Sequence, residues 1–130
     1  MILLDTHVWI WWVNGTKKLP DKIGALINES IEKKEIYISS ISVWETAQLL
    51  KSGRIEFTLD IETWISKTEA LPFVNFVPVS NEIALKSVNL QEPLHQDPAD
   101  RIIIATAIKL GLKLATFDRK IIKYKHVNTV

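Results

Sequence analysis

The sequence predicts an α/β fold, a three-layer α/β/α sandwich with a mainly parallel central sheet. Short apolar runs of strand length alternate along the chain with longer segments of helical period. This alternation favours parallel strands joined by right-handed crossovers, with helices on both faces of the sheet. A chain of 130 residues, 47% of them hydrophobic, is long enough to bury well over half of its unfolded surface. We therefore expect residues 1–130 to form a single domain.

Four apolar runs predict strands, and a fifth run is a weaker candidate. The four lie at 1–4, 36–39, 74–79 and 112–116, and the weaker one lies at 127–130. Helices are predicted between them at 19–35, 40–53, 60–71, 80–90 and 97–111. Pro20 lies near a predicted helix start, and Gly53 and Gly111 lie just past predicted helix ends, where these residue types are common.

Composition narrows the functional classes. Lys and Arg number 16 and Asp and Glu number 15, so a polyanion would have to be held by a local patch rather than by net charge. The sequence has no cysteine, which excludes disulfides and thiolate metal sites and suits a reducing cytosol. The N-terminal stretch lacks a basic leader, and no apolar run approaches ~18 residues. We expect a soluble, cytoplasmic protein without a membrane segment.

Acidic residues recur at the places where the predicted strands end. Asp5 follows the first strand, Glu45 lies in the opening turns of the helix after the second, and Asp118 follows the fourth. Asp97 and Asp100 begin the helix that precedes the fourth strand. Because sites in open α/β sheets gather outside the carboxyl ends of the strands, we expect these acids to share one rim.

Each acid also has an explanation as a helix cap. Asp97, which precedes a proline, fits an N-cap with proline at the first helical position, and Asp100 would then lie in the first turn. Ser42 and Glu45 have the spacing of a capping box. The two acids that directly follow strands can cap the helices they precede. Capping accounts for single acids but gives no reason for all of them to lie at one rim.

A cluster of carboxylates in a partly desolvated cleft predicts a metal ion. The charges repel one another and raise the pKa values unless a cation intervenes. An all-oxygen set without Cys and without a His-x-x-x-His pair selects Mg²⁺ or Mn²⁺ over zinc. His7, His95 and His126 are scattered, so we expect them to support ligands or to lie at the surface. Such a metal site polarises phosphoryl oxygens and activates water, which favours phosphodiester hydrolysis.

Three stretches together resemble the successive motifs of the PIN domain, specifically the VapC-type toxins of prokaryotic toxin–antitoxin pairs. They are "LLDTHVWIWW", "ISVWETAQLLKSGRIEF" and "HQDPADRIIIATAIKLGLKLATFDRKIIKY", and the match covers nearly the whole chain. The resemblance implies a PIN-like fold and a metal-dependent endoribonuclease that leaves a 5′-phosphate and a 3′-hydroxyl. It implies four acids with catalytic and metal-binding roles, namely Asp5, Glu45, Asp100 and Asp118. Asp97 is then a helix cap.

The resemblance also implies how the site is divided. The first and third acids would mainly hold Mg²⁺ or Mn²⁺ and orient a water, while the second and fourth complete the shell or hold a second ion. Thr6 and Thr116 fall where the family commonly has hydroxyl residues near the metal, and local hydrogen bonding explains them at least as well. The implied partners are an RNA substrate and a cognate antitoxin protein.

Residues 8–13, "VWIWWV", are apolar at every position, so a helix there is hydrophobic all round. One explanation is burial under a neighbouring helix. The other is a dimer or antitoxin interface, because aromatic side chains dominate interface hot spots. On the second explanation we expect a homodimer.

Basic residues near the C-terminus are candidates for holding phosphates beside the metal cleft. They are Lys113, Arg119, Lys120, Lys123 and Lys125. A charge run of this kind is more often simply a solvated face. Arg101, Lys51 and Arg54 are further candidates.

Two other functional classes share the predicted fold. A receiver-like phospho-acceptor domain also binds Mg²⁺ through Asp, but it needs an acidic pair ending the first strand and an Asp ending the third, where this chain has Ser80. A catalytically silent PIN-like interaction module would keep the fold as a protein-binding surface. The complete acid set favours the nuclease, and a metal titration separates it from the silent module.

Overall fold

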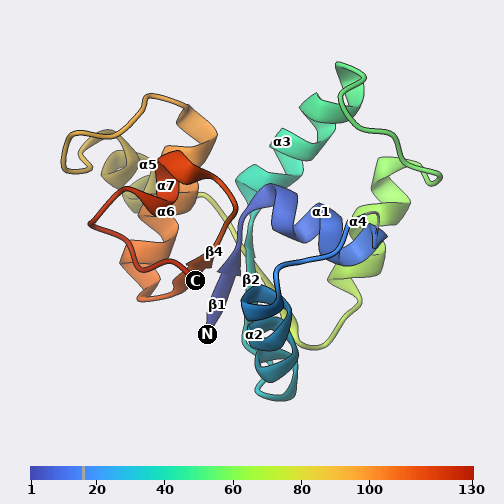
Figure 1. Cartoon of the computed structure of the whole chain (residues 1–130). Coiled ribbons are helices and arrows are strands. Elements are labelled where there is room, and N and C mark those ends of the chain that lie inside the picture. Colours follow the sequence, from blue (N-terminus) through green and yellow to red (C-terminus); the bar gives the residue numbers. More distant parts are fainter. Residues whose placement is uncertain (16) are drawn as a thin grey trace.

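A computed structural model describes residues 1–15 and 17–130 and shows a central sheet flanked by helices (Figure 1). Its strands are β1 (Ile2–Leu4), β2 (Ile36–Ser39), β3 (Val74–Val77) and β4 (Lys113–Ala115). All neighbouring strands are parallel, in the order β3-β2-β1-β4. In the register of the sheet, Leu3 lies opposite Tyr37 on one side and opposite Leu114 on the other. The predicted parallel sheet is confirmed.

The helices of this part of the chain are α1 (Thr6–Asn14), α2 (Asp21–Glu32), α3 (Ser40–Lys51), α4 (Ile61–Glu69), α5 (Asn81–Val88), α6 (Pro98–Leu110) and α7 (Arg119–Ile122). Side-chain oxygens of Asp60 and Ser80 accept backbone N–H bonds at the starts of α4 and α5, which fixes where these helices begin. Gly111 ends α6 in the left-handed conformation, with φ of 65°. No helix in residues 1–15 or 17–130 has the length and apolar character needed to cross a membrane.

Alternate strand residues pack on opposite faces of the sheet, which gives two apolar clusters. Ile2 and Leu4 face α1, α2 and α4, and all of these contribute buried side chains to the first cluster. Leu3 and Leu114 face α5, α6 and α7 in the second cluster. Figure 1 shows the two groups of helices on either side of the strands. The predicted α/β/α layering is confirmed.

Two details differ from the sequence-based expectations. Residues 127–130 form no strand: within the described chain they contribute only an isolated bridge between Thr129 and Leu114, although Val130 N–H donates to Leu114 O at 3.1 Å. No residue range was predicted for the short helix α7, although Asp118 was expected to be able to cap a helix that follows it. Its four residues are too few to show a helical period in the sequence.

The apolar helix α1 is covered mainly by its own chain. Trp9 packs on Trp64 of α4 with ring centroids 4.5 Å apart, and Trp12 packs edge-on to Phe73 at 6.3 Å. Val13 is the one large apolar side chain of residues 8–13 that remains exposed. Burial by neighbouring elements therefore explains the all-round hydrophobic pattern without any partner.

Candidate active site

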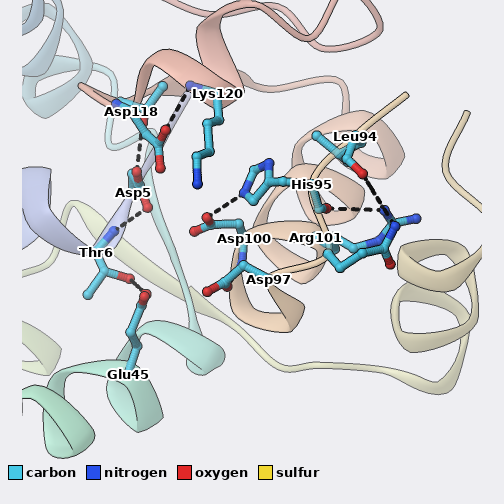
Figure 2. Close-up of polar contacts among 12 residues, drawn as sticks. Asp5, Thr6, Glu45, Leu94, His95, Asp97, Asp100, Arg101, Asp118 and Lys120 are labelled. Carbon is cyan, nitrogen blue, oxygen red and sulfur yellow. Dashed lines mark hydrogen bonds and ion pairs between the residues drawn. The ribbon is translucent and has the colours of Figure 1, made fainter. Parts of the chain in front are cut away.

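The carboxyl ends of the strands open onto a cleft of about 460 Å³. It is lined by Asp5, His7, Trp11, Glu45, His95, Asp97, Asp100, Phe117, Asp118 and Lys120. The four acids named by the resemblance are all in this set. Asp5 follows β1, Glu45 comes from α3, Asp100 comes from α6, and Asp118 lies between β4 and α7 (Figure 2). The predicted convergence of these acids is confirmed, while their catalytic roles remain a prediction.

Asp5 is both a helix cap and a wall of the cleft. Its Oδ1 accepts the N–H of Thr6 at 2.8 Å, and its Oδ2 accepts the hydroxyl of Thr116 at 2.6 Å. Burial raises the pKa of Asp5 to about 6, and repulsion from Asp100 adds to the rise, although the hydrogen bond from Thr116 acts against it. The structure therefore keeps a carboxylate in a place where its charge is costly.

Glu45 reaches the cleft from the second turn of α3. That helix begins at Ser40 with Ser39 as its N-cap, so the alternative explanation of Ser42 and Glu45 as a capping box is wrong. The Glu45 carboxylate instead accepts the hydroxyl of Thr6, which also lies 2.9 Å from Ser42 Oγ. Burial raises the pKa of Glu45 to about 7, with repulsion from the neighbouring aspartates in addition.

Asp97 and Asp100, three residues apart, have different surroundings. Asp97 Oδ1 accepts the backbone N–H of Asp100 at 2.9 Å, which confirms Asp97 as the N-cap of α6. The carboxylate of Asp100 points into the cleft, and its Oδ2 lies 2.7 Å from Nε2 of His95. Burial raises the pKa of Asp100, and the charges of Asp97 and Asp118 contribute, while the hydrogen bond to His95 lowers it.

His95 belongs to a loop whose backbone carbonyls accept hydrogen bonds from Arg101. The Arg101 side chain is buried, and its guanidinium donates to the carbonyls of Ser87 at 2.9 Å, Leu94 at 3.4 Å and His95 at 3.3 Å. It also pairs with Glu92 at 3.3 Å. Figure 2 shows the guanidinium directed at this loop and away from the carboxylates. The expectation that Arg101 holds phosphate is therefore wrong, because its guanidinium is buried and is bound to carbonyls at the end of α5 and in the loop that follows.

The other basic candidates are mostly outside the cleft. Among residues 1–15 and 17–130, Lys120 is the one Lys or Arg in the cleft lining, and Figure 2 shows its side chain extending toward His95 and Asp100. Arg54 lines a smaller groove that also contains Glu45. Lys113 begins β4 and therefore lies at the opposite end of that strand from Asp118. The structure places Arg119, Lys123, Lys125 and Lys51 at exposed positions outside the cleft lining.

The donor atoms of the cleft suit a hard divalent cation. His95, Asp100 and Asp118 each offer a ligand atom, and these atoms lie within 4.8 Å of one another. Asp5 and Glu45 add carboxylate oxygens to the same cleft. The raised pKa values of Asp5, Glu45 and Asp100 mean that their negative charges lack compensation, and a divalent ion would supply it.

From the sequence, His95 was expected to support ligands or to lie at the surface, and its contact with Asp100 was not predicted. The stretch from 89 to 97 has no regular structure, so no periodicity indicates which way its side chains point. Nδ1 of His95 is buried and has no hydrogen-bond partner in the part of the chain that the structure describes. The available signal was the closeness of His95 to Asp100 in the stretch "HQDPAD".

Comparison with known proteins identifies the family. The PIN domain family matches residues 2–127. Ribonuclease VapC22 of Mycobacterium tuberculosis is 32% identical over 130 residues, which cover 99% of this chain and 95% of that protein.

Solved structures support the same fold. VapBC2 from Rickettsia felis, bound to a promoter DNA fragment, is similar with a TM-score of 0.71 and 18% identity, over 100% of this chain and 98% of that one. DNA-bound VapBC from Salmonella typhimurium is similar with a TM-score of 0.69 and 19% identity, over 99% and 96% of the two chains. The PIN domain family matches nearly the whole length of the chain, and the relative that is 32% identical covers 99% of it. The chain therefore belongs to the PIN domain family.

Proposed function

We propose that the chain is a metal-dependent endoribonuclease that acts in the cytoplasm as the toxin of a toxin–antitoxin pair, with residues 1–130 as one nuclease domain. The observation that carries the proposal is the convergence of Asp5, Glu45, Asp100 and Asp118 on one cleft. The relative named Ribonuclease VapC22 supports the reaction and the substrate class, because the likeness extends along both chains.

The site residues would hold Mg²⁺ or Mn²⁺ mainly through Asp5 and Asp100, with Glu45 and Asp118 completing the shell. A bound ion of this kind supplies Lewis-acid polarisation of a phosphoryl oxygen and a water of lowered pKa, which suits hydrolysis to a 5′-phosphate and a 3′-hydroxyl. His95 lies close enough to Asp100 and Asp118 to serve as a further ligand.

The residues around the acids hold these carboxylates in position before RNA binds. The Thr116 hydroxyl fixes one oxygen of Asp5, and the Thr6 hydroxyl fixes the carboxylate of Glu45. Each donor orients its acid and partly offsets the cost of burying the charge. Lys120 adds a positive charge at the same cleft, where it can pair with a phosphate of the substrate.

The proposed protein partner is a cognate antitoxin. The solved relatives include VapBC complexes, and a cleft rich in carboxylates attracts Arg or Lys side chains, which could occupy it in place of a metal. The proposed homodimer does not rest on residues 8–13, because neighbouring elements of the same chain cover most of their apolar side chains. The exposed apolar side chains of α5, Leu85 at 66% and Val88 at 73% exposure, lie one turn apart and are the better candidates for a subunit interface.

The decisive experiment is an RNA cleavage assay on purified protein with Mg²⁺ or Mn²⁺, with and without excess EDTA. We expect cleavage only with metal, and none from Asp5→Asn, because the amide removes a ligand charge while nearly preserving shape. Glu29→Gln is the matched control, since it removes an exposed carboxylate that pairs with Lys33 on α2. Cleavage undiminished by EDTA would contradict the metal mechanism, and an Asp5→Asn variant as active as the control would contradict the site assignment.

A further inference from the structure

The acidic cleft contains an aromatic pair that the proposed hydrolysis does not use. Trp11 of α1 and Phe117, between β4 and α7, line the cleft together with the carboxylates. Their ring centroids are 4.3 Å apart, and the ring planes are inclined by 30°. Both side chains are half-buried, so each packs on the core and still offers ring surface to the cleft. We call this pair the aromatic wall.

The aromatic wall is attached to the same segments that hold the acids. Phe117 lies directly between Thr116, whose hydroxyl binds Asp5, and Asp118, which caps α7. Trp11 belongs to the helix that Asp5 caps. A molecule lying against the wall is therefore next to the carboxylates.

Electrostatic attraction contributes little to RNA binding in this cleft. In the part of the chain that the structure describes, five carboxylates line it together with a single Lys or Arg side chain, that of Lys120. RNA phosphates are repelled by such a surface until a cation neutralises it. An aromatic face attracts a nucleobase without depending on charge, because every base has a π-face. The wall thus supplies an attraction that the rest of the cleft lacks.

A cation lies over the ring of Trp11 in the aromatic wall. Nζ of Lys17 is 5.0 Å from the ring centroid of Trp11, and Lys17 is exposed. A base that stacks on this ring would displace the exposed, flexible lysine side chain, which could then pair with the phosphate groups of the same nucleotide. Aromatic face and neighbouring cation together are the combination with which proteins bind single-stranded nucleic acids.

We propose that the aromatic wall formed by Trp11 and Phe117 is a stacking site for an unpaired nucleobase of the RNA, next to the phosphate that the carboxylates address. The inference rests on the proposed function and makes the substrate class more specific. A base inside a duplex has both faces covered by its neighbours, so it cannot lie on the wall. The wall therefore contacts a base in an unpaired segment of the RNA.

The test compares two fluorescein-labelled probes, a short oligoriboadenylate and the same backbone with abasic residues throughout. Binding is followed by fluorescence anisotropy in Ca²⁺, so that the carboxylates are neutralised, and gels show whether the RNA stays intact. If the RNA is cut, the ratio between the two probes is taken from their cleavage rates at subsaturating RNA instead of from their affinities. Wild-type protein should prefer the base-bearing probe by about 5- to 150-fold, which corresponds to stacking of one base at ~1–3 kcal/mol.

Three variants test whether the aromatic wall causes the preference for the base-bearing probe. Trp11→Leu should reduce it to nearly none, and Trp11→Phe should keep most of it, because a ring is retained. Trp44→Leu is the matched control, since Trp44 is 54% exposed on α3 and lies outside the cleft lining, and it should leave the preference unchanged. Thermal melts establish that each variant is folded, and Phe117→Leu replaces Trp11→Leu if the latter does not fold.

The outcomes separate this inference from the proposed function. A wild-type protein that binds the two probes equally, or binds neither, overturns the stacking site, as does a Trp11→Leu variant that keeps the wild-type preference. A protein with the expected preference that never cleaves RNA with Mg²⁺ or Mn²⁺ overturns the nuclease proposal and leaves the stacking site in place.

Discussion

The two halves of the acidic cleft hold their carboxylates by different means. Asp5 receives hydrogen bonds from the backbone of Thr6 and the hydroxyl of Thr116, and both of these residues are fully or almost fully buried. Asp100 is contacted by the ring of His95, which comes from an irregular loop held by Arg101. The first half is therefore a product of strand pairing, whereas the second depends on one buried side chain.

The strand register explains the first half. Leu4 of β1 lies opposite Ala115 of β4, so the next residues, Asp5 and Thr116, leave the sheet side by side. No such constraint exists for the segment between α5 and α6. There the guanidinium of Arg101 replaces strand pairing by binding several carbonyls of the loop at once.

The largest effect on cleavage is expected in the second half of the cleft, where Asp97 and Asp100 are substituted one at a time. Asp100→Asn should abolish metal-dependent cleavage, because it removes a ligand charge, while metal-free stability stays the same or rises as one repelling charge is lost. Asp97→Asn should keep both activity and stability, since Asn caps as well as Asp, and Asp97→Ala should lose about 0.5–2 kcal/mol of stability. Cleavage assays and thermal melts on the three variants provide the measurement. Equal loss of activity in Asp97→Asn and Asp100→Asn would refute this division of roles.

The second prediction concerns the pH dependence that the buried first half produces. Since burial raises the pKa of Asp5 to about 6 and that of Glu45 to about 7, the folded protein binds more protons than the unfolded chain between about pH 4 and pH 7. The metal-free protein should lose stability as the pH rises through this window. For Asp5, the change from 3.8 to about 6 corresponds to roughly 3 kcal/mol.

Melts in EDTA and in millimolar Mg²⁺ across this pH range would measure the effect. Mg²⁺ should stabilise the protein more above the window than below it, because protonated carboxyls bind metal poorly. Asp5→Asn is the control, since it removes one of the two titrating groups and should reduce the slope of the EDTA curve, leaving the part that comes from Glu45. An increase of stability in EDTA from pH 5 to pH 7 would show that folding does not raise the pKa values of Asp5 and Glu45.

The third prediction tests the loop half directly. Arg101→Leu should lower the free energy of unfolding by about 1–3 kcal/mol, because buried carbonyls of the loop lose their donors. It should also loosen His95, which would appear as a changed NMR signal of the His95 ring. Glu92→Gln is the matched control: Glu92 is exposed, so losing its ion pair should cost less than about 1 kcal/mol. Equal effects of the two substitutions would mean that the ion pair, rather than the carbonyl contacts, holds the loop.

The features that the sequence predicted are those that follow from periodicity and strand ends. Asp5 and Asp118 were located because each comes directly after an apolar run, and parallel strands end at a common rim. The proline after Asp97 distinguished it as a cap from Asp100. The cap follows from the local sequence, whereas the choice of Asp100 as the metal-binding acid came from the resemblance to the PIN domain. The structure confirms that Asp5, Asp97 and Asp118 are helix caps.

What the sequence could not predict depends on tertiary contacts between irregular segments. Arg101 has the same charge whether it meets phosphate or loop carbonyls, and only the path of residues 87–95 decides between them. The spacing of Ser42 and Glu45 fits a capping box, but the true cap lies earlier, at Ser39, because α3 begins directly after β2. The apolar pattern of residues 8–13 did not reveal that α4 and the strand-end aromatics would cover it.

The hydrogen bond between Thr116 and Asp5 joins residues 111 positions apart, and this has a consequence for synthesis. A ribosome makes β1 first and β4 long afterwards, so a growing chain carries Asp5 without Thr116, Asp118 or the pairing strand beside β1. Contacts this distant in sequence form late and slowly during folding. The nascent chain consequently has no assembled acidic cleft, and the proposed nuclease would become active only after nearly all of it has been translated.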